Sequence, residues 1–180
     1  THVTVFPTGG IAPKASNLNV GAGDTAPNLV VVKVGRGGKV SLRNNSGATH
    51  LLADVMGWFP EGSGFAGVSP ARLLDTRSGA TTIDGVAAGV GAVGAKATIS
   101  VPVTGRGGVP ADAGAVVVNI TATGPTAPTH VTVFPTGAPT PNASNLNLAP
   151  GQTRPNLVIV KVGADGSISL RNNAGSTHLI

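Results

Sequence analysis

The chain has 180 residues, a mass of 17.5 kDa, a net charge of +5 and no cysteine. Its 12 basic residues are spread singly without aromatic side chains between them, which argues against a nucleic-acid-binding surface. The lack of cysteine excludes disulfides, cysteine-based zinc sites and thiol catalysis. Aromatic residues amount to 3%, and 27 glycines and 14 prolines favour short strands joined by turns. We therefore expect an all-β fold with a core of Val, Leu, Ile and Ala, and no membrane span.

One stretch of sequence occurs twice. Residues 1–52 (copy 1) align without a gap with residues 129–180 (copy 2), and 35 of the 52 positions are identical. Tandem copies of one unit are typical of arrays, in which neighbouring modules supply length and surface rather than a reaction centre. Since Thr1 aligns with Thr129, the period is 128 residues. We predict antiparallel, sandwich-like modules in tandem.

The first predicted elements of copy 1 are a strand and a bend. Val3 and Val5 alternate with polar residues over residues 2–6, which predicts a short strand that ends at Pro7. The segment Ser16-Asn17-Leu18-Asn19 is identical in both copies. Asparagine side chains readily hydrogen-bond nearby backbone, so we expect these residues to hold a local bend.

The rest of copy 1 predicts an antiparallel meander. Residues 28–34 are rich in β-branched side chains, as are residues 156–162 of copy 2, which predicts a buried central strand in each. The Gly37-Gly38 and Asp165-Gly166 pairs that follow predict hairpins with type I′ turns. Residues 40–43 are expected to return along the first strand, and residues 49–55 to continue the meander.

A module boundary is expected after residues 53–59, which have the sequence ADVMGWF and occur once. We predict that residues 1–60 form the second half of one module, that residues 61–68 are a linker, and that residues 69–180 form the next module without its final strand. The chain is expected to be a piece of a longer repeat protein.

The single-copy segment before copy 2 alternates between loops and strands. Residues 78–95 are rich in Gly and Ala and predict a long loop. Alternation predicts a strand at residues 97–103, and the sequence AVVVNIT predicts a buried strand at residues 115–121.

Seven motifs follow one another along the chain: HVTVFPTG, ASNLN, PNLVVVKVG, VSLRNNSG, THLLADVMGWF, SPARLLDTR and AVVVNITAT. Together they resemble repeat modules of large secreted and cell-surface proteins of actinobacteria. The resemblance covers nearly the whole chain, but the chain begins and ends within a module. It implies an all-β module used in tandem outside the cell or at the cell surface, sometimes beside cell-wall or proteolytic enzyme domains, and it brings no catalytic residues.

The residues that carry chemistry in other proteins do not form a reactive pattern here. The four histidines are two positions seen twice and lack metal-ligand spacing, so we expect no metal site. Asp75 and Arg77 could bind a partner, although an internal ion pair or turn anchor is the favoured interpretation. There is no nucleophile elbow, and the chain has only seven acids. We predict no catalytic residue, no cofactor and no enzymatic activity.

The sequence therefore favours a structural or adhesive repeat of an extracellular protein. Its expected partners are copies of itself, as neighbouring modules or chains joined head to tail into a filament by strand complementation. Val55, Trp58 and Phe59 are the candidate residues for these inter-module strand contacts. The alternative is a module that binds surface glycans or the cell wall, for which Trp58 is the one candidate sugar platform.

Overall fold

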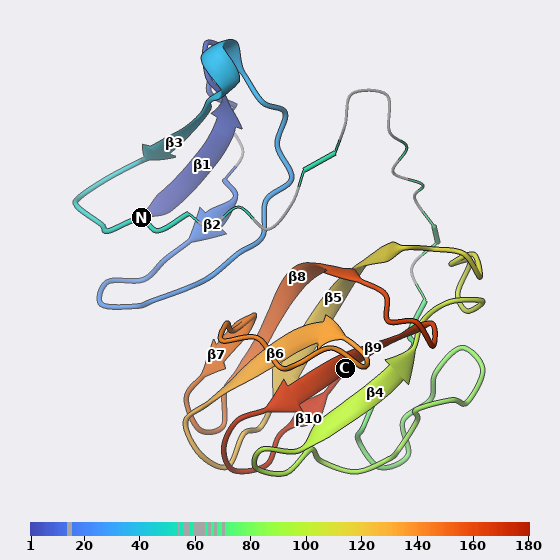
Figure 1. Cartoon of the computed structure of the whole chain (residues 1–180). Coiled ribbons are helices and arrows are strands. Elements are labelled where there is room, and N and C mark those ends of the chain that lie inside the picture. Colours follow the sequence, from blue (N-terminus) through green and yellow to red (C-terminus); the bar gives the residue numbers. More distant parts are fainter. Residues whose placement is uncertain are drawn as a thin grey trace. The chain divides into compact units, whose positions relative to one another are not determined.

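The computed structural model describes residues 1–13, 16–53, 55, 58–59, 64, 66, 68–69 and 71–180. Within these residues the chain is built from three antiparallel β-sheets and one short 3-10 helix, which confirms the predicted all-β class. The chain divides into two compact units, Thr1–Gly57 (unit 1) and Trp58–Ile180 (unit 2) (Figure 1). The predicted linker at residues 61–68 lies mostly outside the described residues and stays a prediction.

Unit 1 contains one sheet with the strand order β2-β1-β3. Its elements are β1 (His2–Pro7), β2 (Leu18–Asn19), the 3-10 helix η1 (Arg36–Gly38) and β3 (Val40–Asn44). The strands predicted at residues 2–6 and 40–43 are confirmed. Both are short, and glycines and prolines bound them as the turn signals indicate.

Unit 2 contains two sheets, with the strand orders β10-β5-β8 and β4-β9-β6-β7. The strands are β4 (Thr98–Pro102), β5 (Ala115–Thr123), β6 (Thr129–Pro135), β7 (Leu146–Leu148), β8 (Thr153–Lys161), β9 (Ser167–Asn172) and β10 (His178–Leu179). Strands are present at the predicted residues 97–103, 115–121 and 156–162. The predicted central position of the last one is wrong, because β8 is an edge strand of its sheet and buries only one face. Residues 78–95 lie outside the strands, as predicted, and isolated bridges pair Ala88 with Asp75 and Val93 with Thr177.

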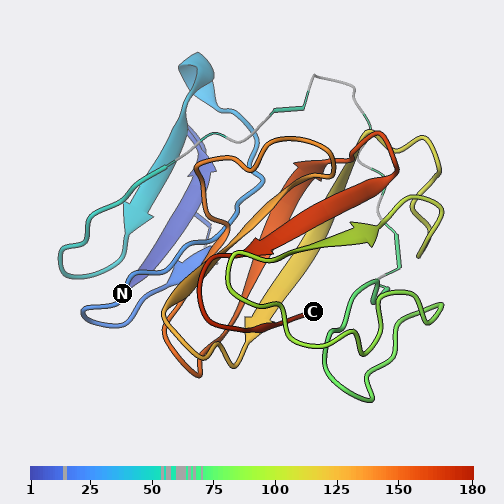
Figure 2. The same ribbon diagram turned by 60° about the horizontal axis from the view of Figure 1, so that its bottom comes forward.

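The two sheets of unit 2, whose strands Figure 2 shows from a second side, share one hydrophobic core. The inner side chains come from both sheets because strand residues point alternately to opposite faces. The most deeply buried apolar members are Val103, Ala122, Val131, Leu146, Val158, Ile168, Leu170 and Leu179. Nearly all of the buried apolar residues are aliphatic, with Phe134 the aromatic exception among those described, in agreement with the composition.

The two copies pair their strands in the same register. Val3 of β1 lies opposite Asn44 of β3, and Val131 of β6 lies opposite Asn172 of β9. The other pairs of β1 with β2 and β3 also return in unit 2, with 128 added to each residue number. The repeated sequence therefore forms the same three-stranded arrangement twice.

The predicted meander is wrong. Strands β8 and β9 follow each other in sequence but belong to different sheets, since β8 pairs with β5 whereas β9 pairs with β6 and β4. The turn between them crosses from one sheet to the other and is not a hairpin. It is not type I′ either, because only Gly166 and not Asp165 has a positive φ.

Two strands predicted in copy 1 are absent from the described residues. Residues 28–34 form no strand, although their counterparts lie in β8, and residues 49–53 form none, although His178 and Leu179 form β10. The partner of both β8 and β10 is β5, and the residues of unit 1 that the structure describes contain no equivalent of β5. Strand propensity alone does not create a strand where the partner is missing.

The asparagine bend was also predicted with the wrong partner. The Asn17 side-chain oxygen accepts from the backbone N–H of Val5 at 2.7 Å, and Asn145 accepts from Val133 at 2.7 Å. Each asparagine thus bonds a neighbouring strand twelve residues away and not its own bend.

A close backbone approach recurs in both copies before the turn that leads to β3 or β9. A side chain at Gly35 would meet the backbone of Thr8 at 2.2 Å, and one at Gly163 would meet the backbone of Thr136 at 2.3 Å. Since real Cβ atoms do not approach so closely, only glycine fits at both positions.

Candidate functional site

An apolar face of unit 1 lacks the cover that the same residues have in unit 2. The residues of this uncovered face whose counterparts are buried in unit 2 are Val40, Leu42 and Leu51. Leu42 is 40% exposed, whereas its counterpart Leu170 is 0% exposed. Val40 is 41% exposed, whereas Ile168 is 1% exposed. Apolar residues that one copy exposes and the other buries mark a candidate interaction surface.

The cover in unit 2 comes from residues 71–128, which we call the first half. Within it, β4 pairs with β9 on the edge that β6 leaves free, and β5 pairs with β8 and β10. In unit 1, β3 pairs with β1 on one edge, and no described strand pairs with its other edge. An open strand edge presents unpaired N–H and C=O groups that can recruit another strand.

The asparagines at the ends of β3 and β9 also differ in their hydrogen bonds to the first half. The Asn172 Nδ2 donates to the carbonyl oxygens of Ala174 and Gly175, each at 3.1 Å, and also to those of Val93 at 2.9 Å and Gly94 at 3.2 Å in the first half. The Nδ2 of its counterpart Asn44 donates to the two local acceptors, Ser46 O at 3.1 Å and Gly47 O at 2.9 Å. The amide of Asn44 is thus oriented as in unit 2 but lacks the two acceptors of the first half.

A hydroxyl pair shows the same pattern on the face of the sheet. In unit 2, Thr136 Oγ1 lies 2.9 Å from Ser169 Oγ and 3.1 Å from Ser100 Oγ of β4. In unit 1, Thr8 Oγ1 lies 2.9 Å from Ser41 Oγ. Two members of the hydroxyl cluster are in place, and the described part of unit 1 contains no equivalent of Ser100.

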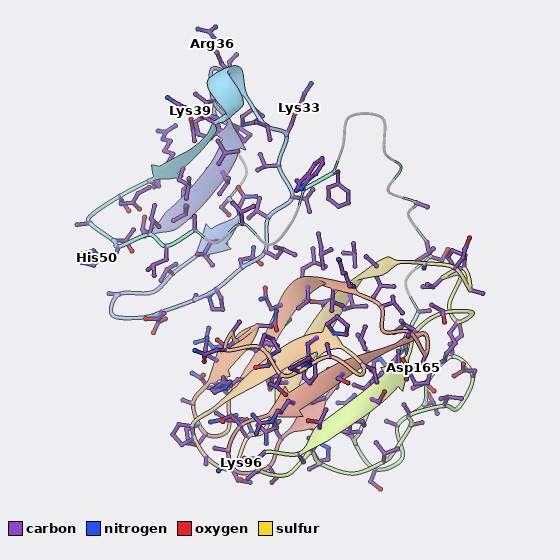
Figure 3. The ribbon with its side chains drawn as sticks, viewed as in Figure 1. Lys33, Arg36, Lys39, His50, Lys96 and Asp165 are labelled. Atoms are coloured by element: carbon purple, nitrogen blue, oxygen red, sulfur yellow. The ribbon has the colours of Figure 1, made fainter. Side chains whose placement is uncertain are left out.

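The end of copy 2 is held by Thr76 of the first half. Leu179 N donates to Thr76 Oγ1 at 3.0 Å, Thr76 N donates to Leu179 O at 3.0 Å, and His178 Nδ1 lies 3.0 Å from Thr76 Oγ1. Leu179 is 0% exposed, and its counterpart Leu51 is 42% exposed. His50 lies on the outer loop of unit 1 (Figure 3).

The candidate inter-module contacts predicted from the sequence, Val55, Trp58 and Phe59, follow copy 1 in the chain. Among residues 53–59 only 53, 55, 58 and 59 are described, and none of them is in a strand. Val55 and Trp58 are strongly exposed, and Phe59 is half exposed. Their role as inter-module contacts stays a prediction.

Sequence reasoning missed the residues of the uncovered face. The sequence did contain a usable signal. Copy 1 and copy 2 are both second halves of a module, but the chain contains the first half, residues 71–128, only once. Since Val40 and Leu42 sit in a predicted strand, their exposure required knowledge of the missing neighbour.

Charged groups of the first half form two internal clusters. The Arg77 guanidinium donates to both carboxylate oxygens of Asp75, at 3.0 Å and 2.7 Å, and Arg72 donates at 2.9 Å. Asp75 is fully buried, and the hydrogen bond from Arg77 lowers its pKa to about 2, against the opposing effect of burial. The favoured interpretation of Asp75 and Arg77 as an internal ion pair is confirmed.

The second cluster connects the loop at residues 78–95 to other parts of the first half. Arg106 donates to both carboxylate oxygens of Asp84, at 2.6 Å and 2.7 Å, and to the carbonyl oxygens of Pro102, Leu73 and Val86. The hydrogen bonds from Arg106 lower the pKa of Asp84 to about 2. Both clusters bind parts of the first half to each other.

Within the described residues, no group of three or more His, Asp or Glu side chains could hold a metal ion. The basic residues of unit 1 that Figure 3 labels, Lys33, Arg36 and Lys39, lie around η1 and the segment before it. In the same described part of the chain there is also no helix of the length and apolarity that crossing a bilayer requires.

Comparisons with family models, with curated proteins and with solved structures found no match for this chain. The difference in burial and strand pairing between copy 1 and copy 2 is therefore the main observation that bears on function.

Proposed function

We propose that this chain is a structural repeat module of an extracellular or cell-surface protein, in which neighbouring sandwich-like modules with a 128-residue period complete one another head to tail. One observation carries the proposal: Val40, Leu42 and Leu51 are exposed in copy 1, whereas their counterparts Ile168, Leu170 and Leu179 are buried in copy 2. A face that one half-module buries and another leaves open favours assembly over catalysis.

Head-to-tail contacts follow from the kind of surface that is open. Copy 1 offers an acceptor edge and the first half offers strands, and these are different surfaces of the molecule. A contact between different surfaces is heterologous and generates a filament when it does not close into a ring. We include Val55, Trp58 and Phe59 among the residues that contact a neighbouring module.

Association of the intact chain tests this function. We expect the mass measured by multi-angle light scattering to rise with protein concentration, and electron microscopy to show linear particles. A Val40→Lys, Leu42→Lys chain should stay monomeric because charges on the edge strand oppose strand addition. The matched control is an Ile83→Lys, Val90→Lys chain, which changes two exposed apolar residues outside the uncovered face. Equal association of both variants would contradict the proposal.

The part played by residues 53–59 is tested by deleting them. If Val55, Trp58 and Phe59 contact the next module, the deletion should reduce association without changing the unfolding of unit 2. Unchanged association would remove these residues from the contact and leave the open edge of β3 as its site.

A glycan- or cell-wall-binding module is the second candidate, because Trp58 is 79% exposed and offers a flat apolar ring. A glycan array and a peptidoglycan pull-down test it, with Trp58→Ala as the variant that should lose binding. Binding that persists in Trp58→Ala would exclude this tryptophan as the platform.

A further inference from the structure

We propose that the uncovered face of unit 1 is the docking surface for one kind of partner: a polypeptide segment with the sequence pattern of the first half, residues 71–128, that is not already paired with a second half of its own. The inference rests on the proposed function and names the partner and its register. Unit 2 shows how this segment pairs with copy 2, which shares 35 of 52 residues with copy 1.

The first contact is the pairing of β4 with the open edge of β3. In unit 2, Ser100 of β4 lies opposite Ser169 of β9. Ser169 corresponds to Ser41, so the same register places Ser100 of the partner opposite Ser41. Residues 40–44 and 168–172 differ only at Val40, where copy 2 has Ile168. The partner's Ser100 would then complete the hydroxyl cluster that Thr8 and Ser41 begin.

The second contact satisfies the amide of Asn44. The partner's carbonyl groups at Val93 and Gly94 would provide the two acceptors that Asn172 has and Asn44 lacks. The local bonds of Asn44 already hold its amide in the orientation seen in copy 2. Docking therefore adds hydrogen bonds without reorienting the side chain.

The third contact gives residues 25–33 the strand partner that they lack. In unit 2, β5 pairs with β8 from Thr153 to Lys161, and with β10. Seven of the nine residues of β8 are identical in residues 25–33. Pairing with the partner's β5 would convert this segment into a strand and cover Leu51, and the partner's Thr76 would bond the backbone of Leu51.

The partner must be unpaired because this chain holds two acceptors and one first half. When copy 1 takes the first half of a second intact chain, copy 2 of that chain is released with the same apolar face open. Exchange between intact chains thus covers no additional residues, so the association expected of intact chains also needs contacts outside the exchanged strands, for which Val55, Trp58 and Phe59 are the candidates. Copy 2 also holds its first half more tightly, since Ile168 replaces Val40 and one buried methylene changes an equilibrium roughly fourfold.

Disulfide trapping tests the partner and the register together, and the native chain has no cysteine to interfere. The probe is a separate polypeptide of residues 71–128 that carries Ser100→Cys. It is mixed in a glutathione buffer with the full chain carrying Ser41→Cys, and the linked product is measured on non-reducing gels and by mass spectrometry. Directly opposite residues of antiparallel strands have Cα atoms about 4.5–5.5 Å apart, within the range that a disulfide spans.

Two matched chains provide the controls. Arg43→Cys lies on the same face of β3 but two residues from the predicted partner, at a diagonal distance of roughly 7–8 Å that is too long for ready linkage. Ser169→Cys is the same residue in copy 2, where the chain's own β4 already occupies the site. We expect the Ser41→Cys chain to link at least about tenfold faster than either control.

The other results would overturn the inference. Equal linkage of the Ser41→Cys and Arg43→Cys chains would indicate contact without register, faster linkage of the Ser169→Cys chain would place the partner on copy 2, and no linkage would exclude docking. If the separate polypeptide precipitates, the same pairs are tested with residues 71–128 fused before Thr1 through a flexible linker. Filaments of the intact chain without linkage at Ser41→Cys would refute the docking register alone, whereas linkage without filaments would refute the filament alone.

Discussion

Copy 1 and copy 2 share 35 of 52 residues, but they have different neighbours in the chain. Residues 28–34 and 156–162 differ at one position, Val31 against Ile159, yet the first segment is irregular and the second lies largely in β8, an edge strand of its sheet. The first half accounts for the difference, because β5 supplies the partner of the second segment. In this fold a neighbour, and not local propensity, decides whether these residues form a strand.

The largest expected difference between the copies concerns their matched leucines. Leu170→Ala should lower the free energy of unfolding of unit 2 by about 2–5 kcal/mol, because it removes a fully buried side chain and leaves a cavity. Leu42→Ala is the same substitution on the uncovered face. It should change the free energy of unfolding of unit 1 by less than about 0.5 kcal/mol. Urea unfolding followed by circular dichroism gives both values. Similar losses would mean that Leu42 is covered in solution.

The matched asparagines should differ next. Asn172→Ala removes hydrogen bonds to the first half as well as to its own turn, and we expect a loss of about 2–3 kcal/mol. Asn44→Ala removes only bonds within unit 1 and should cost less than about 1 kcal/mol. Hydrogen exchange at residues 93–94 provides a direct check, since protection there should fall in Asn172→Ala and stay unchanged in Asn44→Ala.

Acid should destabilise unit 2 more than unit 1, because the carboxylates with lowered pKa values lie in unit 2. The pKa values of Asp75 and Asp84 are both lowered to about 2, so the stability that these groups contribute is complete above about pH 4 and is lost as the pH falls towards 2. The strands β1, β2 and β3 contain no carboxylate. Unit 2 should therefore lose stability in this pH range, as measured by unfolding at successive pH values. Asp75→Asn should be less stable at neutral pH and less sensitive to acid, and an unchanged profile would contradict the assignment.

The smallest expected effect concerns Trp58. Because its side chain is largely exposed, Trp58→Ser should change the free energy of unfolding by less than about 0.5 kcal/mol. The native fluorescence should resemble that of a tryptophan in water and be quenched by iodide. Protection from iodide that appears only at high protein concentration would show that residues around Trp58 enter a contact between chains.

Much of the fold could be predicted from local sequence. Alternation and β-branched runs located β1, β4, β5 and β8, and glycine and proline marked where strands end. The sheet in which a strand lies could not be predicted this way. The turn at Asp165-Gly166 has hairpin composition, but β8 and β9 pair with partners distant in sequence.

The candidate site was hidden for the same reason. Val40 and Leu42 have the sequence of core residues, and nothing local distinguishes them from Ile168 and Leu170. Their exposure depends on the absence of a partner strand, which is a property of the whole chain. Asn17 was likewise recognised as a hydrogen-bonding residue, while its bond to the backbone of Val5 depends on strand pairing.

Gly35 has a consequence for how quickly a partner could bind. Its contact with Thr8 fixes the point at which the backbone leaves the sheet, at the same place as Gly163 does in unit 2. Together with the identical pairing of β1 and β3, this gives copy 1 much of the bound shape before any partner arrives. A preorganised receptor loses little conformational entropy on binding, so most of the ordering falls on the incoming segment and on residues 25–33.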